Sequence, residues 1–302
     1  MQLRGVLPPI PTPFLDSAID HRSLARNVGQ WMRTGLAGVV VLGSNGEAPL
    51  LADDEADAAI ATVREAVPAD RLLVAGTGRE STAATIAACR RAARLGADAL
   101  LVRTPSFFKN VMTADAFVRH YTAVADASPA PVLLYNVTMY TGVNMQSDAV
   151  ARLAGHANIV GIKESGGDVG QIAQLVSDAP EGFTVLAGSA VTFFAALCVG
   201  ASGGVLALAA VLPEPCVRLY GHMQRREYEE ARALQARLTP IARLLGAAYG
   251  VAGLKFALGQ VGYVGGPVRS PLGPLPPGAR REIEEALALV RSATDSPQAT
   301  GR

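Results

Sequence analysis

Length, composition and charge narrow the class of protein first. The chain has 302 residues, 50% of them hydrophobic, and its 27 basic and 26 acidic side chains leave a formal net charge of +1. A large core is therefore available, and no general attraction to nucleic acid or to an anionic membrane is implied. The three cysteines lack metal-ligand spacing, and the N-terminus lacks the features of a signal peptide. We expect a cytoplasmic protein with a small-molecule partner, no metal and no membrane or nucleic-acid partner.

Short apolar runs recur along the chain and predict strands. Most are separated by alanine-rich amphipathic stretches, such as 53–67, 81–95 and 113–127, at the roughly 25 to 35 residue period of βα units. The eight expected strands are 5–8, 38–42, 72–75, 99–102, 132–135, 159–163, 184–187 and 203–206. Eight such units predict an α/β fold, a (β/α)8 TIM barrel. The alternative, an open doubly wound sheet, would place a glycine-rich turn after its first strand, where this chain has four prolines between residues 8 and 13.

One uncharged segment, 193–212, has about the length of a membrane span. Glycines at 200, 203 and 204 divide it and Pro213 closes it, so a buried αβ unit is expected instead. Beyond it the pattern is helical only, at 227–245, 253–261 and 279–292. We therefore expect a barrel over 1–222, a helical extension over 223–292 and a disordered tail over 293–302.

Lys163 closes the apolar run 159–163 in a chain with only two other lysines, Lys109 and Lys255. A buried strand would deliver this amine to the barrel mouth, where active sites of this fold lie. Desolvation there lowers a lysine pKa, and a neutral lysine attacks ketones, which arginine cannot do. The alternative is a strand-end lysine in a salt bridge.

Other strand ends carry polar residues or glycine. GSNGE at 43–47 predicts either a loop that turns Ser44 and backbone N–H groups toward an anion or an ordinary turn. Tyr135 could carry protons or simply cap the core. Gly188, and Val205 after two glycines, leave room for a ligand.

Together, GSNGE at 43–47, Tyr135-Asn136, GIKES at 161–165 and the strand end at 187–189 resemble the dihydrodipicolinate synthase and N-acetylneuraminate lyase family. Within it, NIVGIKESGGDV at 158–169 and YVGGP at 263–267 are most similar to the 4-hydroxy-2-oxoglutarate aldolases. The resemblance implies a class I lyase in which Lys163 forms a Schiff base with a 2-oxo acid, without a cofactor. It also implies a homodimer or homotetramer.

The same resemblance implies roles for single residues. Ser44 and Asn45 would hold the carboxylate of the 2-oxo acid, Tyr135 would move protons, and Ser165 would contact the distal part of the substrate. For 4-hydroxy-2-oxoglutarate, cleavage would give glyoxylate and pyruvate.

Two departures from the family pattern bear on this assignment. Relatives have a tyrosine pair in the loop after the fourth strand, where this chain has Phe107 and Phe108, which we expect at a subunit interface. Tyr140 stands where the synthases carry an arginine for their aldehyde's carboxylate, which argues against a true synthase. Three explanations stay open: Tyr135 and Ser44 act through water, Tyr140, also expected near that interface, supplies the missing hydroxyl, or the reaction differs from the family norm.

Two further functions stay open. A dehydratase acting on a 2-keto-3-deoxy sugar acid would use the same Schiff base. A non-catalytic 2-oxo acid binding protein would explain the lost tyrosines, although it would not need Lys163.

Overall fold

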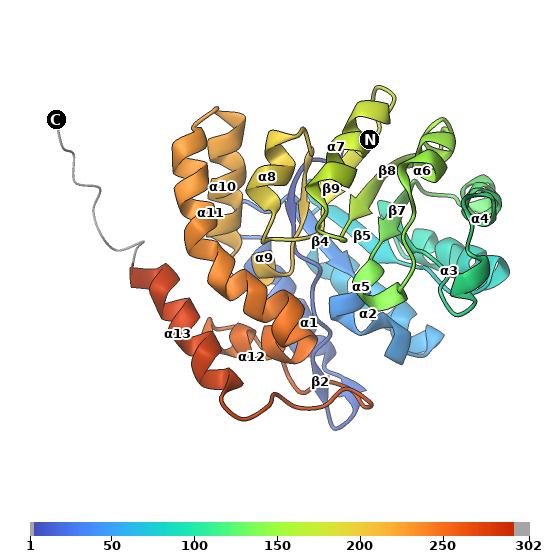
Figure 1. The fold of residues 1–302 in the computed structure, drawn as a ribbon. Coiled ribbons are helices and arrows are strands. Elements are labelled where there is room, and N and C mark those ends of the chain that lie inside the picture. The colour runs from blue at the N-terminus through green and yellow to red at the C-terminus, as the bar shows by residue number, and fades with distance from the viewer. Residues whose placement is uncertain (1–2, 293–302) are drawn as a thin grey trace.

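A parallel eight-stranded sheet curves into a barrel, which confirms the expected (β/α)8 fold (Figure 1). The computed structural model describes residues 3–292. The strands of this sheet follow the order β1-β10-β9-β8-β7-β6-β5-β4. The barrel closes between the end of β1 and β4, where Val40 N–H donates to Pro8 O and Ile10 N–H donates to Val40 O, both at 2.9 Å. The strands are β1 (Gly5–Leu7), β4 (Gly38–Val41), β5 (Leu72–Gly76), β6 (Ala99–Arg103), β7 (Val132–Asn136), β8 (Ile159–Glu164), β9 (Thr184–Ala187) and β10 (Gly203–Val205).

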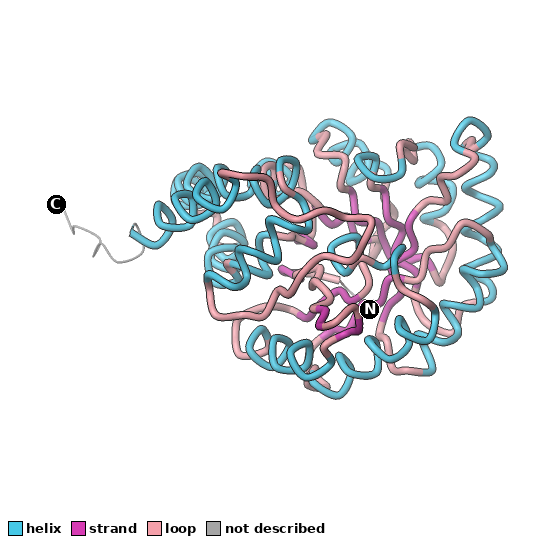
Figure 2. Tube along the Cα trace, turned by 90° about the horizontal axis from the view of Figure 1, so that it is seen from below, coloured by secondary structure: helices cyan, strands magenta, loops and turns pink. Residues whose placement is uncertain are grey.

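Helices surround the strands, as the view in Figure 2 shows. They are α1 (His21–Trp31), α2 (Asp53–Ala66), α3 (Thr82–Arg94), α4 (Ala114–Ala127), α6 (Ser147–Ala154), α7 (Val169–Asp178), α8 (Phe193–Cys198) and α10 (Pro213–Gln224). Short helices α5 (Thr138–Thr141) and α9 (Leu208–Val211) follow β7 and β10. A small hairpin, β2 (Phe14–Leu15) with β3 (Ala18–Ile19), was not expected from the sequence. In the described residues, no helix is long and apolar enough to span a membrane.

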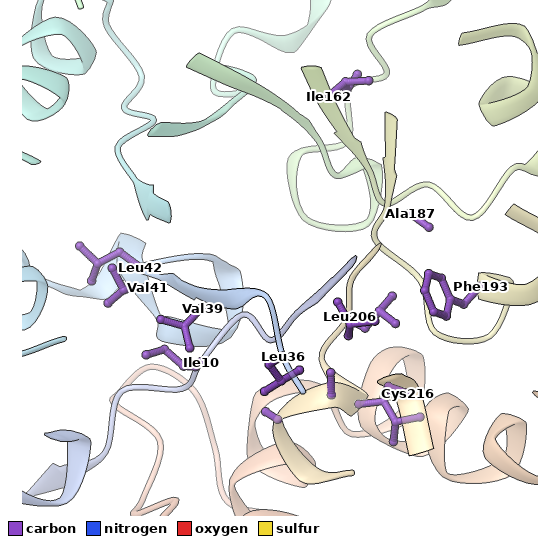
Figure 3. Close-up of a cluster of buried hydrophobic side chains, with 14 of the residues drawn as sticks. Ile10, Leu36, Val39, Val41, Leu42, Ile162, Ala187, Phe193, Leu206 and Cys216 are labelled. Atoms are coloured by element: carbon purple, nitrogen blue, oxygen red, sulfur yellow. The ribbon is translucent and has the colours of Figure 1, made fainter. Parts of the chain in front are cut away.

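Alternation along the strands creates two cores, because successive residues of a strand face opposite sides of the sheet. The first core lies between sheet and helices and includes Val39, Val41 and Ile162 (Figure 3). The second core fills the barrel and includes Leu133, Tyr135 and Leu186. This alternation decides which residues at the strand ends reach the barrel mouth.

The C-terminal helices lie along one side of the barrel (Figure 1). They are α11 (Tyr228–Arg243), α12 (Gly250–Gln260) and α13 (Ala279–Ser292), with a π-helical turn over Leu244–Ala248. The sequence predicted that the helix is interrupted between residues 245 and 253, whereas most residues of this stretch are helical. The predicted disordered tail, 293–302, lies outside the described residues.

Candidate active site

Lys163 projects into the barrel near the C-terminal end of β8. It is paired in register with Tyr135 on β7 and Leu186 on β9, both of the interior core. The residue is 3% exposed, and this burial lowers the pKa of its amine to about 7. Among the described residues, no carboxylate forms an ion pair with Lys163, so the alternative of a strand-end lysine in a salt bridge is wrong for this part of the chain. A large share of the amine is therefore neutral, and nucleophilic, near neutral pH.

Tyr135 lies beside this amine. The Lys163 Nζ atom is 4.1 Å from the centroid of the Tyr135 ring, and the Tyr135 hydroxyl is 3.2 Å from Ser44 Oγ. Burial raises the pKa of the phenol, while Ser44 and Ser165 act in the opposite direction. The phenol is thus protonated at rest and hydrogen-bonded to a hydroxyl that can exchange protons with it.

The loop after β4 brings Ser44 and Asn45 to the mouth in a short 3-10 turn, Ser44–Gly46. The N–H groups of Gly46 and Glu47 close the turn by donating to the carbonyls of Gly43 and Ser44. Glu47 then adopts a left-handed conformation, with φ of 56°. The turn therefore leaves the first amides, those of Ser44 and Asn45, as the groups available to an anion.

Ser165 lies over Gly188. A Cβ atom at Gly188 would stand 1.8 Å from Ser165 Oγ, so no other residue fits there. The serine hydroxyl thus occupies the space that a side chain at position 188 would need, and Gly188 itself lines the cavity, where the sequence suggested that it makes room for a ligand. Gly188 thus acts by letting Ser165 approach β9.

Glu164 was missed in the sequence, and it fixes the loop that carries Ser165. It faces away from the barrel interior, where its carboxylate accepts hydrogen bonds from Asn136 Nδ2 at 2.7 Å, Gln171 Nε2 at 3.1 Å and Gly166 N–H. Burial raises its pKa, and these donors partly offset that effect. Its place beside Lys163 in the sequence gave the only hint of this role.

A cavity of about 300 Å³ brings most of the predicted site residues together. Its lining includes Lys163, Tyr135, Ser44, Asn45, Ser165, Gly188, Val205 and Tyr140. It also includes residues that sequence analysis did not single out, among them Met139, Leu208 and Arg243. The last of these comes from α11, and no local pattern in the sequence indicates that this helix reaches the barrel mouth.

Tyr140 extends from α5 to the start of α12. Its hydroxyl lies 3.9 Å from where a Cβ at Gly250 would stand, and burial together with the nearby Tyr135 raises its pKa. Phe107 and Phe108, by contrast, do not line this cavity. They are 77% and 71% exposed and contact each other edge to face, with ring centroids 5.1 Å apart.

The described residues contain no group of three or more histidine, cysteine or acidic side chains placed to hold a metal ion. The cavity's polar groups are instead an amine, two phenols, serines, an amide and one guanidinium. An amine with a depressed pKa beside a phenol, at the mouth of a (β/α)8 barrel, has the parts of a Schiff-base enzyme.

Comparison with known proteins confirms this class and gives the family. The chain belongs to the dihydrodipicolinate synthetase family, whose model matches residues 2–289. It is thus an enzyme of the class I, pyruvate-dependent aldolase type, with a Schiff-base lysine.

Three relatives illustrate the similarity. A 4-hydroxy-tetrahydrodipicolinate synthase from an Exiguobacterium species is 34% identical over 94% of this chain and 96% of its own. The structure of the synthase of the same name from Methylacidiphilum fumariolicum SolV has a TM-score of 0.92, with 32% identity, covering 96% of this chain and 97% of that one. A chloride-inhibited dihydrodipicolinate synthase from Acinetobacter baumannii, complexed with pyruvate, has a TM-score of 0.91, with 28% identity, covering 96% and 99%. These relatives are named synthases and not 4-hydroxy-2-oxoglutarate aldolases.

Proposed function

We propose that the enzyme cleaves 4-hydroxy-2-oxoglutarate, or a similar 4-hydroxy-2-oxo acid, to pyruvate and an aldehyde such as glyoxylate. The observation that carries the proposal is the buried Lys163, with a pKa of about 7, in one cavity with Tyr135 and Ser44. A neutral amine, a phenol and a hydroxyl are the groups that this chemistry needs.

Imine formation comes first. The neutral Lys163 amine attacks the C2 ketone, and the resulting carbinolamine loses water as Tyr135 donates its proton to the departing oxygen. This leaves a protonated imine beside a tyrosinate, two opposite charges that stabilise each other in a dry pocket.

The substrate is oriented by its C1 carboxylate. The Ser44 hydroxyl, the Asn45 amide and the free backbone N–H groups of this turn would hold it. The pyruvate bound to the Acinetobacter baumannii relative supports the assignment of a 2-oxo acid to this cavity. Fixing this end of the substrate places C2 over Lys163.

Carbon–carbon cleavage follows. The Tyr135 phenolate takes the proton of the C4 hydroxyl, the C3–C4 electron pair moves into the protonated imine, and glyoxylate leaves. The remaining enamine is protonated at C3 to give the pyruvate imine, and water hydrolyses it to pyruvate and free Lys163.

The synthase reaction is the second candidate, because the Exiguobacterium relative, 34% identical, carries the synthase name. There the pyruvate enamine would attack an aldehyde instead of being formed by cleavage. Tyr140 at the position expected for the synthase arginine argues for the aldolase instead.

Product analysis distinguishes these reactions. Incubation with 4-hydroxy-2-oxoglutarate is expected to yield equal amounts of pyruvate and glyoxylate by nuclear magnetic resonance, and the Lys163→Ala variant is expected to yield neither. A dehydrated 2-oxo acid as product would contradict the cleavage, as would turnover only when pyruvate is supplied together with an aldehyde.

A further inference from the structure

The cavity above Lys163 contains cations but no anion. Among the described residues that line it, none is aspartate or glutamate, whereas Lys163 and Arg243 are both present. Lys163 becomes positive once it forms a protonated imine. An occupied site of this kind favours a ligand with more than one negative charge.

Arg243 has no partner among the described residues. The residues that the structure describes place no hydrogen bond or ion pair on its exposed side chain. Two other arginines close to the barrel mouth are neutralised: Arg103 is 2.7 Å from a Glu80 oxygen, and Arg269 is 2.7 Å from a Glu55 oxygen.

The local backbone gives Arg243 access to the cavity. It is the last residue of α11, and the π-helical turn Leu244–Ala248 follows it. Two small residues of that turn, Gly246 and Ala247, line the cavity beside it. Just after the turn, a Cβ at Gly250 would stand 3.9 Å from the hydroxyl of Tyr140, which lies on the cavity wall. Such π-helical turns often occur at functional sites.

We infer that Arg243 binds a carboxylate on the half of the substrate farther from C1, so that the enzyme prefers dicarboxylic 2-oxo acids. This inference rests on the proposed function. The two carboxylates of the substrate would bind at different parts of the cavity: the turn with Ser44 and Asn45 binds the C1 carboxylate, and the Arg243 guanidinium binds the second one. A guanidinium suits this role because its fork can donate two parallel hydrogen bonds to one carboxylate.

This inference narrows the class of aldehyde that the enzyme would release to aldehydes that carry a carboxylate. After C3–C4 cleavage the distal carboxylate remains on the aldehyde product, as it does in glyoxylate. Neutral sugar-derived chains would leave Arg243 without a partner, so a dehydratase for a monocarboxylic sugar acid fits this cavity less well.

The test compares two acids of equal length, 2-oxoglutarate and 2-oxopentanoate, by titrating borohydride-trapped imine on intact protein. The wild type is expected to bind 2-oxoglutarate at least tenfold more tightly. Arg243→Gln is expected to lose this preference while its affinity for 2-oxopentanoate and pyruvate stays within about twofold. Arg243→Lys should retain part of the preference, since it keeps the charge but not the fork.

Arg237→Gln is the matched control, because Arg237 is an exposed arginine of the same helix that does not line the cavity. It should behave as wild type. An imine with pyruvate but an unchanged preference in Arg243→Gln would overturn this inference alone. Failure of the wild type to form an imine even with pyruvate would overturn the proposed function as well.

Discussion

The three lysines differ in what surrounds them. Lys109 is exposed, and Lys255 is buried but lies 2.5 Å from the Glu47 carboxylate. Lys163 is buried beside a phenol, and no carboxylate among the described residues compensates it. Because charge on this amine is penalised by desolvation alone, its pKa is lowered to about 7. The same burial that costs stability makes the amine reactive.

This shift gives a pH dependence. Attack on pyruvate requires the neutral amine, so the rate of imine formation should rise with pH, reach half its maximum near pH 7 and level off above it. Stopped-flow trapping of the imine between pH 5 and 10 would measure the profile. A rate that still climbs toward pH 10 would show an amine with the ordinary lysine pKa of 10.5.

Substitutions of Tyr135 and Ser44 should affect different kinetic parameters. Tyr135→Phe removes the proton donor and acceptor but keeps the ring, so kcat should fall by about 100-fold or more with little change in pyruvate affinity. Ser44→Ala should also weaken pyruvate binding, because it removes a ligand of the carboxylate. Steady-state kinetics with pyruvate competition separates the two effects, and near-normal kcat in Tyr135→Phe would exclude the phenol from the mechanism.

At the scale of elements, the turn after β4 is held by the C-terminal extension. The Glu47 carboxylate and Lys255 of α12 form an ion pair with side chains 0% and 2% exposed. Lys255 also donates to Pro267 O at 2.6 Å, and Arg269 N–H donates to Glu47 Oε2 at 2.7 Å. The extension thus fixes the residue that directly follows the Ser44–Gly46 turn, so it supports the anion-binding part of the site.

Breaking this pair should be costly. Lys255→Met leaves the Glu47 carboxylate buried without its cation, and we expect the free energy of unfolding to fall by about 3–5 kcal/mol. The control is Arg281→Met, which breaks a solvent-exposed pair with Glu285 and should leave the free energy of unfolding nearly unchanged. Urea denaturation of both variants would measure the difference, and equal small losses would mean that the buried pair does not stabilise the turn.

Sequence patterns predicted the barrel because strand periodicity and the strand-end lysine are local signals. The same patterns predicted that Lys163, Tyr135 and Ser44 lie close together, since the C-terminal ends of parallel strands meet at the barrel mouth. They could not place Arg243 or pair Glu47 with Lys255, because these depend on how the extension packs against the barrel. The π-helical turn escaped prediction for the same reason: its glycine and small residues indicated a break in the helix.

For the whole molecule, an exposed apolar patch stands out on a surface of nearly neutral net charge. Phe107, Phe108 and Val111 are 77%, 71% and 61% exposed. Their loop is not loose, because Glu80 accepts hydrogen bonds from Ser106 N–H at 2.8 Å and Phe107 N–H at 2.9 Å. A fixed aromatic patch of this kind is typical of a protein interface.

We expect the protein to form a homodimer or homotetramer through this patch. Light scattering should give a mass of two or four chains, and Phe107→Glu combined with Phe108→Glu should reduce it by burying charge in the interface. Leu15→Glu is the control, since Leu15 is 62% exposed and lies outside the patch. A wild-type monomer with full activity would contradict this expectation.

The central claim is that Lys163 becomes covalently attached to a 2-oxo acid, and borohydride reduction in the presence of pyruvate tests it most directly. Peptide mass spectrometry should then find a reduced pyruvate adduct on Lys163, no adduct in Lys163→Arg, and loss of activity in step with labelling. An adduct confined to Lys109 or Lys255, or full turnover in Lys163→Arg, would contradict the account.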